Sequence, residues 1–270
     1  MGKFVEPEIF ILAETKINYE GVQNYNKFLE FLGVPAWATD AKSDAEQLME
    51  TAGKLCYLSF STDLNKNLTK TGTRNNYDYL QKGIIATEHG SVLEHATVTI
   101  AFMNVSRIFT HELVRHRTGA AYSQVSGRYV RTDDVHMFLP SVIKEKPHAV
   151  ELFKNAMMQM EVNMDRLANI FQIDEMKTPA QFSLKKILTS AFRRLIGNGQ
   201  ANHILATYNH RTLRHIIELR TSQHAEEEIR LAFHKLFLLL KDKFPAVYGD
   251  AKISEPINGI PEIVFEHKKV

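Results

Sequence analysis

The sequence predicts an α+β fold, in which a small mixed or antiparallel sheet packs with a bundle of long helices in a single domain over residues 1–270. Short apolar or alternating runs typical of strands are confined to the first half of the chain, whereas the pattern after Pro147 is almost entirely helical. No Gly-x-Gly-x-x-Gly motif is present, so we expect no Rossmann fold.

The first half combines short strands with helices. Residues 9–12 predict a strand, and residues 96–104 predict another because they alternate and carry β-branched side chains. Residues 136–139, closed by Pro140, are a third candidate. Helical periodicity is present over 22–32, 43–57, 75–87 and 105–117. Arg115 and Arg117 would then lie in the last turn of the helix over 105–117, where cations suit the helix dipole.

The second half predicts four more helices, over 149–173, 180–196, 199–223 and 225–243. Gly197 and Gly199 separate the second of these from the third. The tail from Pro245 is irregular, with further prolines at 256 and 261. Neither an internal repeat nor a low-complexity linker interrupts the chain, which favours one domain.

Composition narrows the possible functions. The 270 residues are 44% hydrophobic and 24% charged, as in an ordinary globular protein. A net charge of +2 argues against a nucleic-acid partner. No run approaches the roughly 18 apolar residues of a membrane span, and the N-terminus does not resemble a signal peptide, so we expect no membrane association. Cys56 is the only cysteine, which excludes an intrachain disulfide and fits a reducing, cytoplasmic location.

The segment 115–129 is the most informative motif. It contains Arg115, His116, Arg117 and Arg128 among small and hydroxyl residues, and no acidic residue occurs from 115 to 131. Guanidinium groups offer forked donors to phosphate or carboxylate oxygens, which favours an anion site. A solvated basic loop is the alternative.

A second motif is His89-Gly90-Ser91-Val92-Leu93-Glu94-His95. Its spacing does not match the His-Glu-x-x-His of zinc proteases, so we expect no metal. A structural interpretation makes Ser91 a helix cap that forms a capping box with Glu94. The start of a helix beside His89 would also suit a phosphate or a planar ring.

A third motif spans Tyr208–Arg220. In a continuous helix, Asn209, Leu213, Ile216 and Arg220 share one stripe, while Arg211, Arg214 and Glu218 point to the other side. Arg220 therefore lies at the end of an apolar stripe, where a charged group needs a partner. That partner is either an anionic ligand or a carboxylate such as Glu94 or Glu226.

Together these motifs resemble the flavin-dependent thymidylate synthases over 86–131 and 190–230. The family signature Arg-His-Arg, a spacer and Ser-x-Arg-Tyr is present at 115–129 with eight spacer residues instead of the usual seven. The patterns His-x-Ser-x-x-Glu-His and Asn-x-Arg-x-Leu, with an arginine eleven positions after the asparagine, are also met. Phe192 and Gly197 replace the alanine and proline that flank the Arg193 motif, and Glu112 stands where many members carry Gln. The family core corresponds to about 45–245, with extensions at both ends.

The resemblance implies roles for individual residues. The implied FAD-binding residues are His89, Ser91, Arg115, His116, Arg117, Gln124, Asn209, Arg211 and His215. The implied dUMP-binding residues are Glu112, Arg115, Gln124, Ser126, Gly127, Arg128, Arg193 and Arg220. Arg220 would be the catalytic residue, because it would bind the pyrimidine and favour ionisation at N3.

The implied reaction is the reductive methylation of dUMP to dTMP, with 5,10-methylenetetrahydrofolate as one-carbon donor and NAD(P)H-reduced FAD as hydride source. Cys56 lies apart from the cation-rich motifs, so activation of the pyrimidine would be electrostatic and would need no cysteine nucleophile. The resemblance also implies a homotetramer with active sites between subunits. Two alternatives remain: another flavin or nucleotide enzyme, such as a tRNA uracil methyltransferase, and a non-catalytic nucleotide-binding protein.

Overall fold

The computed structural model describes residues 2–56, 59, 74–129, 134–256 and 258–270. The strands are β1 (Glu8–Glu14), β2 (Thr97–Ser106), β3 (Ala120–Gln124), β4 (Ala201–Asn209), β5 (Ala251–Ile253) and β6 (Ile263–Phe265). The longer helices are α1 (Tyr19–Phe31), α2 (Asp44–Leu55), α5 (Arg107–Leu113), α7 (Pro147–Ile170), α8 (Pro179–Phe192), α9 (His210–Thr221) and α10 (Glu227–Lys243). The shorter ones are α4 (Asn76–Asp78), η1 (Tyr79–Ile85), η2 (Gly90–Glu94), α6 (Ser141–Lys144), η3 (Ile173–Glu175), η4 (Arg193–Leu195) and α11 (Pro245–Tyr248).

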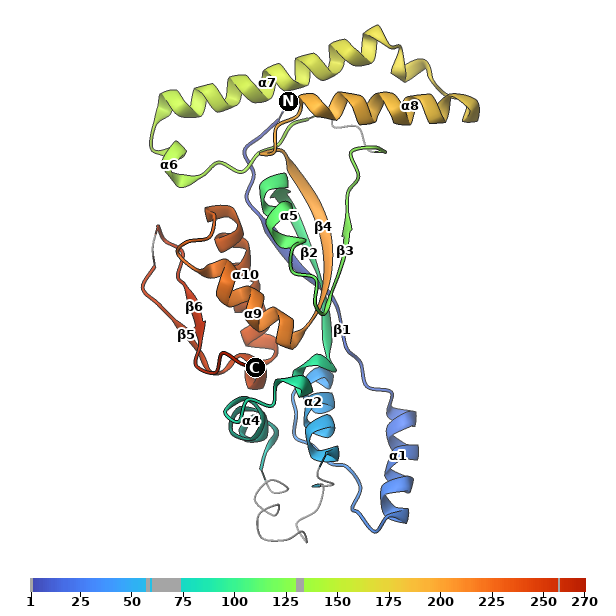
Figure 1. The fold of residues 1–270 in the computed structure, drawn as a ribbon, viewed down its shortest axis with the longest axis vertical. Helices are drawn as coiled ribbons and strands as arrows, with labels where there is room; N and C mark the ends of the chain where they lie inside the picture. The colour runs from blue at the N-terminus through green and yellow to red at the C-terminus, as the bar shows by residue number, and fades with distance from the viewer. Residues whose placement is uncertain (1, 57–58, 60–73, 130–133, 257) are drawn as a thin grey trace.

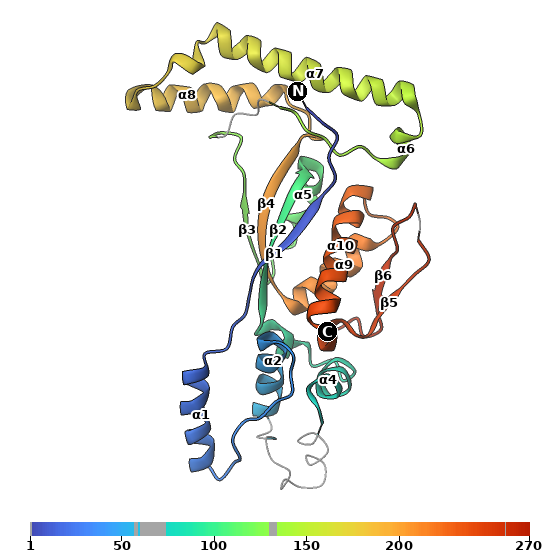
Figure 2. The same cartoon turned by 180° about the vertical axis from the view of Figure 1, so that it is seen from behind.

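The molecule is elongated, with the β-sheet near its middle (Figure 1). The helical hairpin of α7 and α8 lies at one end, and α1, α2 and α4 lie at the other. Seen from behind, α9 and α10 again lie between the sheet and the β5–β6 hairpin (Figure 2). The sequence prediction of a small antiparallel sheet packed with helices is therefore confirmed. None of the helices in the described ranges is long and apolar enough to cross a membrane.

The main sheet has the strand order β1-β2-β4-β3, and every neighbouring pair is antiparallel. Strand β4 is central, with Ala206 opposite Ile100 of β2 and Tyr208 opposite Ala120 of β3. Its burial alternates along the strand, as expected where one face packs on a core. The end of β4 leads directly into α9, so the sheet fixes where that helix begins.

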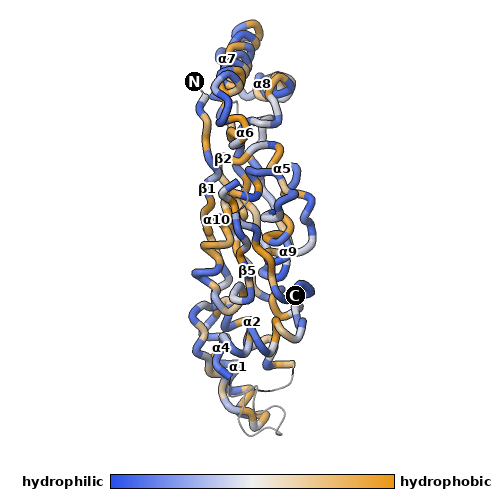
Figure 3. The backbone as a smooth tube through the Cα atoms, turned by 90° about the vertical axis from the view of Figure 1, so that its left-hand side faces the viewer, coloured by the Kyte–Doolittle hydropathy of each residue, from blue (hydrophilic) through white to orange (hydrophobic). Residues whose placement is uncertain are grey.

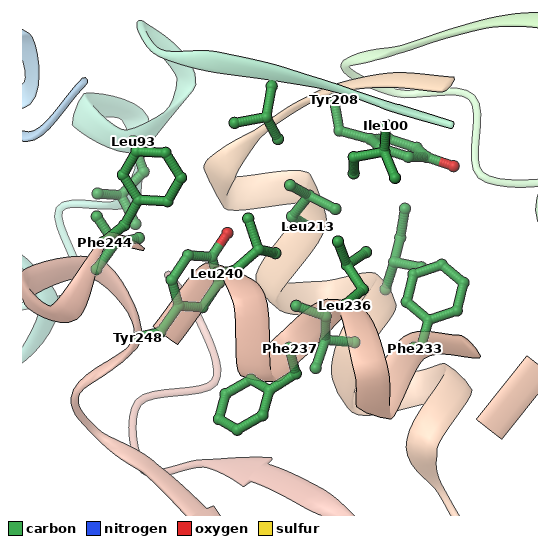
Figure 4. Close-up of a cluster of buried hydrophobic side chains, with 14 of the residues drawn as sticks. Leu93, Ile100, Tyr208, Leu213, Phe233, Leu236, Phe237, Leu240, Phe244 and Tyr248 are labelled. Carbon is green, nitrogen blue, oxygen red and sulfur yellow. The ribbon is translucent and has the colours of Figure 1, made fainter. Parts of the chain in front are cut away.

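The core fills the space between the sheet and the helices α9 and α10. Figure 4 shows Ile100 and Tyr208 of the sheet facing Leu213 of α9 and Phe233 and Leu236 of α10. Figure 3 shows apolar residues on α7 and α8 at the far end of the molecule as well, away from this core. Several of those side chains are exposed, among them Leu152, Phe182 and Ile187.

Most predicted helices and the strands at 9–12 and 96–104 are confirmed, but two predictions are wrong and one strand was missed. The predicted helix over 199–223 is strand β4 up to Asn209 and helix only from His210, because pairing on both edges decides the conformation of a central strand. Strand β3 was not predicted. The candidate strand over 136–139 makes only isolated bridges at Met137.

The helix predicted over 105–117 is also shorter than expected. It begins at Arg107, where the Ser106 hydroxyl accepts a hydrogen bond from the Phe109 amide, and it ends at Leu113. Arg115 and Arg117 therefore lie in the loop that follows the helix, rather than in its last turn. The loop returns the chain to the sheet as β3.

Candidate active site

The junction between β4 and α9 lies directly beneath the Arg-His-Arg loop. Asn209 caps α9, because its side-chain oxygen accepts from the Thr212 amide at 2.8 Å. Gly119 has φ +64°, and a Cβ at this position would lie 2.3 Å from the Asn209 Nδ2. The Thr212 hydroxyl also donates to the Thr118 carbonyl at 3.0 Å. Glycine thus allows the loop to pass close over the helix start.

Arg220, near the end of α9, reaches back to the residues before this loop. Its Nη1 donates to Glu112 Oε2 at 2.5 Å, and its Nη2 donates to the Glu112 carbonyl at 3.1 Å. Its Nε donates to His116 Nε2 at 2.9 Å. The Arg220 side chain is 17% exposed, so burial is only partial. The expected ion pair exists, but its partner is Glu112 rather than Glu94 or Glu226.

His116 is neutral at pH 7. Burial, together with the neighbouring cations Arg220 and Arg115 and the ring of His215, lowers the pKa of His116 to about 4. A neutral ring can accept from Arg220 through Nε2, as the geometry requires. The ring of His215 meets that of His116 edge-on, with centroids 6.5 Å apart. Four predicted site residues, Glu112, His116, His215 and Arg220, are therefore brought together.

Arg115 and Arg117 flank His116 and are exposed. Among the described residues, neither forms an ion pair with a carboxylate. Their guanidinium groups can therefore bind an anion. Because both residues lie in an exposed loop, a ligand can reach them.

The His89–Glu94 motif lies against the first turn of α9. A Cβ on Gly90 would lie 2.9 Å from Arg211 Nε and 2.9 Å from Val270 Cα. Arg211 Nη1 donates to Glu94 Oε1 at 2.6 Å. The predicted capping box is wrong: His89 precedes the short helix η2, Ser91 lies within it, and no side chain caps it.

His89 and Ser91 line a cavity of about 340 Å³, which lies within the usual range for small-molecule sites. Cys56 of the α2 end, together with Arg74 and Lys82, lines the same space. Histidine, hydroxyl and cationic donors beside apolar walls suit a ligand with a planar ring and phosphates. Within the described residues, the lining therefore fits a flavin nucleotide.

A second cavity, of about 580 Å³, lies at the other end of α5. Arg107, Gly127, Arg193 and Arg194 line it, together with His136 and His203. Burial and the charge of Arg193 lower the pKa of Arg107, and the only partner found for its guanidinium in the described ranges is the Val125 carbonyl at 3.5 Å. Asp134 also lines this cavity. Two arginines that lie close together nevertheless favour the binding of an anion.

The predicted substrate residues Ser126, Gly127 and Arg128 follow β3 at this second end. A Cβ on Gly127 would lie 3.5 Å from the Arg193 Cδ and 3.8 Å from the Arg107 Nη2. Gln124 lies between the two clusters, since its amide donates to the Thr110 hydroxyl on α5 at 3.0 Å. The predicted substrate residues thus form two clusters joined by α5: Glu112 and Arg220 lie at one end, and Gly127 and Arg193 lie at the other.

The sequence did not single out Arg107. Its one signal was a cation directly after a serine at the start of a predicted helix, which alone is commonplace. Arg214 was predicted to point away from the stripe of Arg220, but its burial was not predicted: it is 1% exposed and donates to both oxygens of Asp250 at 2.7 and 2.8 Å. The C-terminal hairpin covers that face of α9, so the helix is buried on two sides.

Comparison with known proteins gives consistent results. The family model described as thymidylate synthase complementing protein matches residues 39–246. The flavin-dependent thymidylate synthase of Corynebacterium glutamicum is 34% identical over 223 residues, covering 83% of this chain and 86% of the relative. That of Mycobacteroides abscessus is 33% identical over 239 residues, covering 85% and 90%.

Two solved structures share the fold. Thymidylate synthase X from Helicobacter pylori, determined with FAD and dUMP, superposes with a TM-score of 0.56 at 17% identity, covering 90% of this chain and 98% of the other. The UMP/dUMP methylase PolB from Streptomyces cacaoi gives a TM-score of 0.62 at 14% identity, covering 92% and 95%. At these identities, the likeness concerns the fold alone.

Proposed function

Since this chain belongs to the family of flavin-dependent thymidylate synthases, we propose that it methylates dUMP to dTMP at the two clusters joined by α5. The single observation that carries the proposal is the contact of Arg220 with Glu112 and His116, which gathers residues of two family motifs around one partly buried guanidinium. A non-catalytic nucleotide-binding protein would not need this arrangement.

The reaction forms a carbon–carbon bond at C5 of the pyrimidine and releases the C5 hydrogen as a proton. The one-carbon unit comes from 5,10-methylenetetrahydrofolate, and a hydride then completes the methyl group, leaving tetrahydrofolate. When FAD is bound and reduced by NAD(P)H, it supplies that hydride. The protein contributes orientation of the reactants and stabilisation of developing charge.

Arg220 provides the activation of the pyrimidine. A guanidinium that donates to the ring stabilises negative charge on it, more strongly where water is excluded. Cys56, the only cysteine in the sequence, lines the cavity of His89 and Ser91 and lies apart from Arg220 and Glu112. Electrostatic stabilisation by Arg220 therefore replaces a cysteine nucleophile.

The dimensions of α5 suit a nucleoside monophosphate. Arg107 and Glu112 are five residues apart, which corresponds to roughly 8 Å along a helix axis. The phosphate would lie against Arg107 and Arg193, with Ser126 and Arg128 adding donors. The pyrimidine would then reach Arg220 and Glu112 at the other end, with Gln124 between them.

FAD would be held by residues around the first turn of α9. His89 and Ser91 contribute from the smaller cavity, and Asn209 and Arg211 from the helix. Arg115, Arg117 and His215 supply further donors. Folate and NAD(P)H carry anionic groups as well, so the same exposed arginines suit their transient binding.

We also propose that the protein is a homotetramer. Large apolar side chains remain exposed on α7 and α8, including Leu152 and Ile187, and no described segment covers them. Apolar surface of this extent on two adjacent helices is typical of an interface with another chain. A second copy is the occupant that the family membership favours.

An assay of product formation tests the function. Purified protein is incubated with FAD, NADPH, methylenetetrahydrofolate and dUMP carrying tritium at C5, and both dTMP and tritiated water are measured. The proposal predicts equal amounts of both and their absence in Arg220→Ala. Replacing dUMP with UMP identifies a ribonucleotide methylase. A wild-type protein that binds dUMP but forms no dTMP would contradict the proposed reaction.

A further inference from the structure

Two adjacent glutamates at the start of α10 make the same contact with two different serines. Both carboxylate oxygens of Glu227 accept from the Ser141 amide at 3.0 Å, and Oε2 also accepts from its hydroxyl at 2.9 Å. Glu228 accepts from the Ser106 amide at 2.7 Å and makes a short contact with its hydroxyl. Ser141 begins α6, whereas Ser106 precedes α5.

Ser106 joins Glu228 to the first turn of α5. Its hydroxyl oxygen accepts from the Phe109 amide at 3.0 Å, which caps the helix. A hydroxyl has one hydrogen to donate, so directing it to Glu228 turns a lone pair toward the helix. Both Ser106 and Glu228 are 2% exposed, so water does not compete for these contacts.

The helix held in this way carries candidate substrate residues at both ends. Arg107 directly follows Ser106 and lines the larger cavity, and Glu112 binds Arg220. A change at the start of α5 would displace Arg107 first, because the two residues are joined by one peptide bond. By contrast, no candidate site residue lies on α6.

We propose that Glu228 is a positioning residue for dUMP: through Ser106 it fixes the start of α5 and so holds the Arg107 guanidinium against the phosphate end of the site. The identity of the ligand in this inference rests on the proposed function.

Stability alone would not favour a carboxyl group at the position of Glu228. No cation is found beside Glu228 among the described residues, and a buried carboxylate without one is costly. Burial, with Glu226 and Glu6 nearby, raises its pKa to about 7. Glutamine would fit the same space without a charge. A role in holding Ser106 accounts for a polar group that packing does not require.

The test compares Glu228→Ala with the matched control Glu227→Ala. The dissociation constant of dUMP is measured by calorimetry, with FAD affinity and turnover in parallel. Glu228→Ala should weaken dUMP binding about tenfold or more, since small displacements of binding groups have effects of this size or larger. FAD affinity should not change. Glu227→Ala should bind dUMP like wild type, because α6 carries no candidate residue.

Two further variants keep the inference open to refutation if Glu228→Ala does not fold. Glu228→Gln should stay within about threefold of wild type, since its amide still contacts both Ser106 groups. Ser106→Ala should weaken dUMP binding as Glu228→Ala does. Unchanged dUMP affinity in folded Glu228→Ala or Ser106→Ala, or equal weakening in Glu227→Ala, overturns the inference.

The two proposals fail in different ways. A wild-type protein that binds dUMP but does not form dTMP contradicts the proposed reaction, while the calorimetric comparison still decides the role of Glu228. A wild-type protein that does not bind dUMP contradicts both.

Discussion

One residue, Glu112, engages both terminal nitrogens of Arg220. Its carboxylate accepts from Nη1 at 2.5 Å and its backbone carbonyl accepts from Nη2 at 3.1 Å, while Nε donates to His116. A guanidinium has five N–H donors, so about two remain for a ligand. The orientation of Arg220 is therefore fixed before substrate binds.

Arg220→Lys should lower kcat/KM for dUMP by about 100-fold or more. An ammonium is a point charge that cannot keep the three contacts of the planar guanidinium and still face the pyrimidine. Glu112→Gln serves as the comparison and should retain activity within about tenfold, because the amide oxygen can still accept from Nη1. Steady-state kinetics of dTMP formation measure both, and wild-type kcat/KM in Arg220→Lys would refute the role of Arg220.

His116 should make the folded protein sensitive to acid. Its pKa is lowered to about 4, so the folded state disfavours the charged ring. The contribution of His116 to the free energy of unfolding is fully present above pH 6.5, the pKa in the unfolded state. It is lost as the pH falls toward about 4, the pKa in the folded state. Between pH 7 and pH 5 the loss should be on the order of 2 kcal/mol.

Denaturant unfolding of wild type and His116→Asn at the two pH values measures this loss. Between pH 7 and pH 5, the free energy of unfolding of wild type should fall by about 2 kcal/mol more than that of His116→Asn. A difference that does not depend on pH would show that His116 titrates normally.

Arg107→Gln should weaken the binding of dUMP but not that of deoxyuridine. The lost hydrogen bonds to a charged group correspond to about 1.5–3 kcal/mol, and deoxyuridine lacks the phosphate that receives them. Lys154→Gln removes the same charge from an exposed site on α7 and should change neither affinity. Calorimetric titration with both ligands decides the matter: equal weakening for both would place Arg107 elsewhere in the site.

Breaking the buried ion pair of Arg214 with Asp250 should strongly destabilise the protein. Arg214 also donates to the Val247 carbonyl and stacks on Phe265, so it fastens the C-terminal hairpin to α9. Asp250→Ala leaves a buried guanidinium without its carboxylate, which should cost about 3–5 kcal/mol.

The exposed pair of Lys252 and Glu266 in the same hairpin is the control. Lys252→Ala should cost less than about 1 kcal/mol. Chemical denaturation compares the two variants, and similar small losses would mean that the buried pair is dispensable.

Sequence patterns singled out the candidate site residues more completely than they predicted the strands and helices that position them. The glycines and arginines of segment 115–129 are local features, so the pattern itself singled them out. Asn209, by contrast, was predicted to lie inside a helix, whereas it caps the start of α9. The contact between Glu112 and Arg220 joins residues 108 positions apart, and no local pattern predicts which carboxylate an arginine meets. Glu94, which was considered for Arg220, pairs with Arg211 instead.

The burial of Arg214 was not predicted for a related reason. An amphipathic pattern implies one buried face, whereas α10 and the sheet cover one side of α9 and the β5–β6 hairpin covers another. Strand β4 was missed because its Ala, Leu and His residues suit a helix as well as a strand. Its pairing with both β2 and β3 is a long-range property that local propensity does not contain.

The visible absorption spectrum of the purified protein tests the central claim most directly. The protein is loaded with FAD, reduced by NADPH without air, and then mixed with dUMP and methylenetetrahydrofolate. We predict that the flavin bands bleach on reduction and return only when both substrates are present, in step with dTMP formation. A protein that remains colourless with added FAD, or whose reduced flavin ignores dUMP, would contradict a flavin-dependent synthase.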